Sequence, residues 1–102
     1  MAQLTHTPSI LPQAEQALAG KTSRRIGNNT NLVKEDTNII ATLHGNPIVR
    51  YTEDVVFASW AGYVTNTTRD RLNQLTSRKF SIKNGQPLVD GQPVSAYDWY
   101  EV

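Results

Sequence analysis

Between Thr30 and Thr65, apolar and polar residues alternate in short runs that are typical of β-strands. In "NIIATLH", residues 38–44, Ile39, Ala41 and Leu43 fall on one face and the intervening residues on the other. The runs "TNLVKE", "NIIATLH", "PIVRYT" and "VVFASWAGYV" are separated by "DTN", "GN" and "ED", which are residue types of tight turns. This pattern predicts an antiparallel meander with one face against a core.

Two segments have the pattern of helices instead. "PQAEQALAG" predicts a short N-terminal helix, because Pro12 suits a first turn and Gly20 can end it. In "TTRDRLNQL", Thr67 and Asp70 stand three residues apart, as in a capping box, which predicts a helix over about residues 68–76. Its apolar residues lie on one side, so we expect it to pack on the sheet.

The C-terminal tail contains the near-repeat "NGQPLV" and "DGQPVS", whose Asn-Gly and Asp-Gly pairs favour type I′ hairpin turns. The expected fold is therefore α+β: a small antiparallel sheet of four to six strands, one packed helix at about 68–76, and a short N-terminal helix. We expect residues 1–27 to form an N-terminal arm that carries the short helix, and residues 28–102 to form a single α+β domain.

Composition excludes several classes of function. A chain of 102 residues supports one small domain, and without cysteine and with two histidines a metal site is not expected. No apolar run approaches the roughly 20 residues that span a bilayer, and the first residues do not resemble a signal peptide. No nucleophile elbow or phosphate loop is present. We therefore expect a non-enzymatic protein without a cofactor and without a membrane segment.

The charge is uneven although the net charge is only +1. Residues 67–83 hold one acid, Asp70, and five bases: Arg69, Arg71, Arg78, Lys79 and Lys83. Such a segment is either a solvated face or a site for a negatively charged group. Both readings remain open from the sequence.

The start of the helix at about residue 68 is the best candidate for a binding site. Backbone N–H groups at a helix N-terminus attract anions, arginines can bind phosphate through two donors, and aromatic residues upstream can stack a base. The alternative is that Thr67 caps the helix, Asp70 pairs locally and Trp60 lies in the core. The candidate ligand-binding residues are Trp60, Tyr63, Thr65, Thr67, Thr68, Arg69, Arg71 and Asn73. On the binding reading, replacing either arginine by glutamine would weaken binding and leave the melting temperature unchanged or slightly raised.

The segments "NNTNL", "ATLHGNPIV" and "WAGYVTNTTRDRLNQL" and the terminal "WYEV" resemble a family of small accessory proteins of tailed bacteriophages. Its pattern is L-H-G followed by A-G-[WY]-x-T-x-T-T-R-x-R-[LI]-N, and Tyr63 stands where tryptophan is common. The resemblance implies a phage protein but no reaction or ligand.

From the residues and the resemblance together, we expect a host-takeover or counter-defence protein in the host cytoplasm. It would bind a phosphate-bearing ligand, either nucleic acid or a signalling nucleotide. One alternative is an inhibitor that binds a host protein through aromatic and edge-strand surface, including Tyr97, Trp99 and Tyr100. Another is a minor virion structural protein. We also expect a homo-oligomer, because a small sheet with an aromatic terminal strand leaves an edge to cover.

Overall fold

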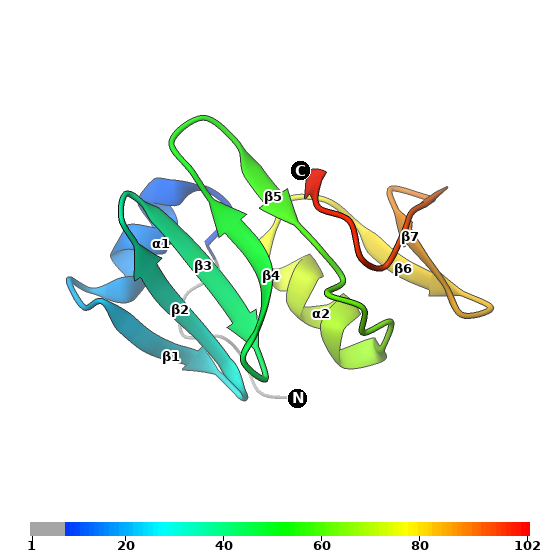
Figure 1. Ribbon diagram of the computed structural model, residues 1–102, viewed down its shortest axis with the longest axis horizontal. Coiled ribbons are helices and arrows are strands. Elements are labelled where there is room, and N and C mark those ends of the chain that lie inside the picture. Colours follow the sequence, from blue (N-terminus) through cyan, green and yellow to red (C-terminus); the bar gives the residue numbers. More distant parts are fainter. Residues whose placement is uncertain (1–7) are drawn as a thin grey trace.

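The computed structural model describes residues 8–102; residues 1–7, which belong to the expected arm, lie outside that range. Its main element is a six-stranded antiparallel sheet with the order β1-β2-β3-β4-β5-β9 (Figure 1). The strands are β1 (Ser23–Gly27), β2 (Thr30–Glu35), β3 (Asn38–Leu43), β4 (Asn46–Tyr51), β5 (Val56–Ala58) and β9 (Tyr100–Glu101). The expected meander is confirmed and accounts for four of the six strands, β2 to β5, while β1 was not predicted as a strand.

One face of this sheet forms the core. Leu32, Ala41, Val49 and Ala58 are aligned across four neighbouring strands, and each is fully buried. Ile39, Ala41 and Leu43 belong to the same core cluster, as the alternation in β3 predicted. Burying these aliphatic side chains supplies the main favourable free energy of folding.

The N-terminal helix α1 (Leu11–Leu18) packs against β1, β2 and β3. It ends at Ala19, whose φ of 54° is left-handed, and Gly20 follows with φ 80°. Leu11, Ala14, Ala17 and Leu18 are buried in the core cluster. The described part of residues 1–27 is therefore integrated into the domain through α1 and β1, and residue 27 marks no boundary in the packing.

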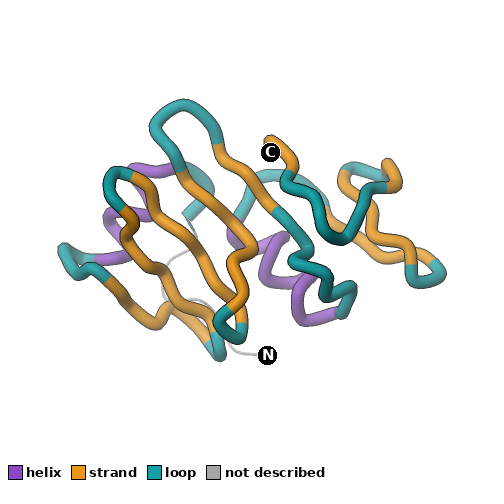
Figure 2. The backbone as a smooth tube through the Cα atoms, in the orientation of Figure 1, coloured by secondary structure: helices purple, strands orange, loops and turns teal. Residues whose placement is uncertain are grey.

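The second helix, α2 (Asn66–Leu75), is followed by a separate three-stranded sheet of β6 (Phe80–Lys83), β7 (Gln86–Val89) and β8 (Gln92–Pro93). Figure 1 shows α2 between the two sheets. Both predicted hairpin turns have two successive positive φ angles, at Asn84-Gly85 (51° and 78°) and at Asp90-Gly91 (51° and 82°). The single expected sheet is thus two sheets, since the tail pairs with itself before β9 returns to β5 (Figure 2).

Among residues 8–102, neither helix has both the length and the apolar character that crossing a membrane requires. The longer of the two, α2, has 10 residues.

Tyr51 of β4 ties the end of α2 to the N-terminal segment. Its side chain is fully buried, and its hydroxyl lies 2.7 Å from the carbonyl oxygen of Leu75 and 3.1 Å from that of Pro8. Burial raises the pKa of Tyr51 well above its ordinary value of 10.0, because the phenolate would lose its hydration. The neutral hydroxyl is consequently the form that stabilises the fold.

We predict that Tyr51→Phe lowers the free energy of unfolding at pH 7 by about 1 kcal/mol, since one buried hydrogen bond is lost. Above pH 10 the difference in free energy of unfolding between the wild type and Tyr51→Phe should shrink and then change sign. There the unfolded wild type binds fewer protons than the folded protein, so its stability falls by about 1.4 kcal/mol per pH unit from this residue alone. Urea unfolding of the wild type and of Tyr51→Phe at pH 7 to 11.5 measures the difference in their free energies of unfolding. The other tyrosines are present in both proteins, so their contributions cancel. A gap that stays constant with pH would contradict the assignment.

Candidate functional site

A pocket of about 470 Å³ opens between the β3–β4 hairpin and the start of α2. The hairpin turns at His44-Gly45, where both φ angles are positive (52° and 81°). The wall of the pocket combines apolar side chains with hydroxyl, amide and imidazole groups: Leu43, His44, Asn46, Ile48, Trp60, Tyr63, Thr65, Thr67 and Thr68. This size and this mixture are typical of small-molecule sites.

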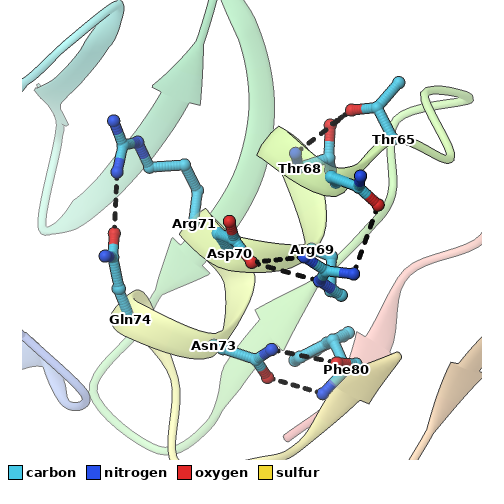
Figure 3. A network of polar contacts seen from close by, with 9 residues as sticks. Thr65, Thr68, Arg69, Asp70, Arg71, Asn73, Gln74 and Phe80 are labelled. Atoms are coloured by element: carbon cyan, nitrogen blue, oxygen red, sulfur yellow. Dashed lines mark hydrogen bonds and ion pairs between the residues drawn. The ribbon is translucent and has the colours of Figure 1, made fainter. Parts of the chain in front are cut away.

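Helix α2 begins at the pocket and is capped by Thr65. Thr65 has an extended backbone (φ −127°, ψ 162°), and its Oγ1 accepts the backbone N–H of Thr68 at 3.2 Å (Figure 3). The predicted capping box of Thr67 and Asp70 is therefore wrong. The helix starts at Asn66, so Thr67 already lies in the first turn and Asp70 in the second.

The first turn of α2 retains donors for a ligand. The carbonyl of Thr65 accepts the N–H of Arg69 at 3.0 Å, and its hydroxyl accepts that of Thr68. The N–H groups of Asn66 and Thr67 have no partner within a helix that starts here. Together with the positive end of the helix dipole, they favour an anion at this end of the pocket.

Trp60 forms the floor of the pocket. It is fully buried, and its ring meets Phe80 edge-on, with 5.9 Å between centroids and 71° between planes. Within residues 8–102 its indole Nε1 is the buried side-chain donor that lacks a hydrogen-bond partner. The N–H is enclosed within the core together with the ring, so it is not part of the accessible surface of the pocket. The buried ring itself leaves no exposed face on which a base could stack, unlike Tyr63, which is 54% exposed at the rim.

Arg71 lies in the interior, away from the pocket. It is 4% exposed; its Nε donates to Thr30 Oγ1 at 2.9 Å and its Nη1 to Gln74 Oε1 at 2.8 Å. A further donor, Nη2, lies 3.4 Å from the carbonyl oxygen of Asn28. Figure 3 shows this side chain pointing to the opposite side of α2 from Arg69. Arg71 therefore joins α2 to the β1–β2 turn, which corrects its expected role at a surface anion site.

Two further candidate residues bind neighbours within the protein. Arg69 forms a salt bridge with Asp70, with 3.0 Å between Nη2 and Oδ1, and also donates to Asn66 Oδ1. The side-chain amide of Asn73 donates to the carbonyl of Phe80 at 2.9 Å and accepts its N–H at 2.6 Å. Asn73 thus imitates a strand partner and attaches β6 to α2.

The structure brings five of the eight sequence candidates to one pocket: Trp60, Tyr63, Thr65, Thr67 and Thr68. Arg69, Arg71 and Asn73 are not in its wall. The opposite wall, Leu43, His44, Asn46 and Ile48, was not predicted as part of a site. The turn-forming "LHGNPI" places these residues on a hairpin, but nothing in its spacing indicates that this hairpin faces α2. Within residues 8–102, no group of three or more acidic or histidine side chains could hold a metal ion.

The C-terminal aromatic residues lie beside the segment that leads to α2. A Cβ on Gly62, whose φ is 80°, would meet the Tyr97 ring at 2.7 Å; the backbone conformation favours glycine here, and a larger residue would also displace the exposed Tyr97 ring. Tyr97 is 79% exposed and Trp99 41% exposed. Arg50 lies over the Trp99 ring, 5.6 Å from its centroid.

The fold is that of a small α+β protein with one polar-rimmed pocket at a helix start. A family model, described as Kyanoviridae Gp96 protein, matches residues 7–101, and the chain belongs to this family. Family membership confirms the expected bacteriophage protein, and the matched region includes α1 as well as the segments that carried the resemblance. No curated protein and no solved structure matches the chain significantly.

The cap assignment gives a paired prediction. Thr65→Ala should lower the free energy of unfolding by about 1 kcal/mol, because the N–H of Thr68 loses its acceptor. Thr67→Ala, two residues further along the same pocket wall, should change it by less than about 0.5 kcal/mol. Chemical denaturation of both variants shows which threonine caps α2. A larger loss of unfolding free energy in Thr67→Ala than in Thr65→Ala would instead support the capping box of Thr67 and Asp70.

Arg71 and Arg69 give a second pair of predictions. Arg71→Gln should destabilise the protein by about 2 kcal/mol, since it removes charged donors from Thr30 and from the Asn28 carbonyl in the interior. Arg69→Gln should change stability by less than about 0.5 kcal/mol, because its salt bridge lies near the surface. Thermal unfolding followed by circular dichroism provides the comparison. Equal melting temperatures for the two variants would contradict the structural role of Arg71.

Proposed function

We propose that this phage protein acts without catalysis, by binding a small phosphate-bearing ligand of nucleotide size in the pocket at the start of α2. The observation that carries the proposal is the pocket of about 470 Å³ beside the helix start, whose wall combines apolar side chains with the hydroxyl groups of Thr65 and Thr67. A concave site that joins apolar surface to a few polar groups is the usual form of a small-molecule site. The site of action would be the cytoplasm of the infected host.

The two ends of the pocket suit the two parts of a nucleotide. The exposed Tyr63 at the rim offers an aromatic face for a flat ring, beside the apolar side chains of Leu43 and Ile48 in the wall. The hydroxyls of Thr65 and Thr67 and the first-turn N–H groups of α2 offer neutral donors for a phosphate. The residues in the wall are thus arranged for recognition, and they include no pair of groups placed for general acid–base chemistry.

A second candidate function is the binding of a host protein through the aromatic surface of Tyr97, Trp99 and Tyr100. The exposure of Tyr97 and Trp99, and the stacking of Arg50 on Trp99, support it, because exposed aromatic and arginine side chains are enriched at binding surfaces. The expected homo-oligomer would use surface of the same kind and stays a prediction. Host-protein binding and oligomerisation both depend on residues outside the pocket wall, so substitutions of these aromatic residues separate them from ligand binding in the pocket.

The two tryptophans of the chain provide a matched test. Calorimetric titration of the purified protein with ribonucleotides should detect binding, and Trp60→Phe should weaken it about fivefold or more, because the smaller phenyl ring changes the shape of the wall that the indole lines. Trp99→Phe, the same change outside the pocket wall, should leave the affinity unchanged. Both variants are first checked for wild-type circular dichroism.

The results discriminate between the candidates. If no nucleotide binds the wild type, the proposed function is wrong. If Trp99→Phe weakens binding and Trp60→Phe does not, the ligand lies on the aromatic surface instead of in the pocket. Loss of a host protein from a pull-down with Trp99→Ala, but not with Trp60→Phe, would support the second candidate.

A further inference from the structure

The two helices pack on one face of the six-stranded sheet and leave the other, here called the outer face, without a helix in residues 8–102. The buried leucines and alanines of α1 and the buried leucines of α2 all belong to the core cluster, on the inner face. Because side chains alternate along a strand, the register row next to the inner row points outward. This outer row crosses five strands and consists of Val33, Ile40, Arg50, Phe57 and Glu101.

Where the outer face crosses β4, β5 and β9, it combines two aromatic side chains with two opposite charges. Phe57 is half-buried, and Trp99, just before β9, is 41% exposed. Trp99 lies against Arg50, whose guanidinium carbon is 5.6 Å from the ring centroid. Arg50 and Glu101 are exposed and stand on either side of Phe57 in the row. Aromatic residues beside an arginine are typical of the centre of a protein interface.

The two charges do not pair with each other within one chain. Two strand spacings, about 9.5 Å, separate their backbones. The salt bridges within residues 8–102 join other residues, Arg69 to Asp70 and Arg78 to Asp90. A guanidinium that stacks on an aromatic ring keeps N–H donors at its edge for a carboxylate. The outer face therefore presents one positive and one negative group on the two sides of a phenyl ring.

A second copy of the chain offers these charges in the complementary order. In a two-fold symmetric dimer whose sheets pack face to face, the row of one copy meets the same row reversed. With the axis along β5 and over Phe57, the two Phe57 rings meet, and Arg50 of each copy faces Glu101 of the other. Packed sheets lie about 10 Å apart, a distance that the two long side chains bridge together. Both charges are then paired, and each pair occurs twice.

Other positions of the two-fold axis leave charges unpaired. With the axis over β4, the two Arg50 side chains would face each other. With the axis midway between β4 and β5, Arg50 would face Phe57, and with the axis over β3 it would face Val33. A charge without a partner in an apolar contact is unfavourable. Charge complementarity therefore selects the axis over Phe57.

We infer that the outer face at β4, β5 and β9 is the interface of a homodimer, centred on Phe57 and held by two reciprocal ion pairs between Arg50 and Glu101. The inference goes beyond the proposed function and does not depend on it, because none of these residues lines the pocket. It replaces the general expectation of an oligomer with one face and one register. Trp99, exposed in the single chain, is then covered by the second copy instead of a host protein.

Reversal of the charges tests the pairing. Sedimentation velocity of the purified protein over a wide range of concentrations measures the dissociation constant of the dimer. Arg50→Glu and Glu101→Arg each create two contacts between like charges, so each should weaken the dimer about tenfold or more. The combined Arg50→Glu/Glu101→Arg variant has opposite charges in exchanged positions and should recover most of that loss.

Two variants serve as controls, and all variants are first checked for wild-type circular dichroism. Lys83→Glu reverses an exposed charge on β6 of the second sheet and should leave the dissociation constant unchanged. Val33→Asp adds a charge to the outer face on β2, three strands from Phe57 and outside the overlap of the two copies. It should also have no effect.

Each outcome bears on the inference. A monomer at every concentration refutes it, as does a dimer that neither single reversal weakens. A dimer that the single reversals weaken and the combined variant does not restore would mean that Arg50 and Glu101 do not face each other, which overturns the proposed axis. A dimer that is lost in Val33→Asp and kept in Arg50→Glu would overturn it too, by placing the contact over β2 and β3. Nucleotide titrations play no part in these results, so the failure of one proposal leaves the other intact.

Discussion

The buried guanidinium of Arg71 is the constraint on which the placement of helix α2 depends. A charged group that is 4% exposed must keep fixed acceptors, and Arg71 finds them on Thr30, Asn28 and Gln74. Losing any of them would leave a buried donor unpaired, so the β1–β2 turn and α2 are held in one relative position. Only two aliphatic side chains of α2, Leu72 and Leu75, are buried, and apolar packing alone would hold it weakly.

Two further polar contacts complete this attachment. Asn73 binds both backbone groups of Phe80 and so connects α2 to the second sheet, while the Tyr51 hydroxyl binds the carbonyl of Leu75 at the other end of the helix. Phe80 in turn packs edge-on against Trp60. Trp60 in the wall of the pocket is therefore connected to α2 through Phe80.

The arrangement separates structural from available polar groups on a single short helix. On one side of α2, Arg71 and Gln74 bind each other within the fold, and Arg69 forms a salt bridge with Asp70. What remains toward the β3–β4 hairpin is a set of neutral donors around an apolar floor. Under the proposed function, a pocket of this kind would select ligands by shape and by the position of acceptors rather than by the strong electrostatic attraction typical of nucleic-acid surfaces.

Local sequence was sufficient for strands β2 to β5, for the turns between them and for the existence of both helices, but not for β1. Alternation placed Ile39, Ala41 and Leu43 on the core face, and Asn-Gly and Asp-Gly pairs specified two hairpins, because these effects act over two to four residues. Five of the eight residues predicted from this local reasoning line the pocket at the start of α2.

Tertiary structure decided the rest. Thr65 and Thr67 both suit a cap, and only the path of the preceding chain selects Thr65. Arg69 and Arg71 are equivalent in sequence, but a shift of about 200° around the helix turns one to solvent and buries the other. The pairing of β9 with β5, and the meeting of the His44 hairpin with α2, join segments far apart in the chain. Such contacts depend on the packing of the whole core, and no local pattern contains them.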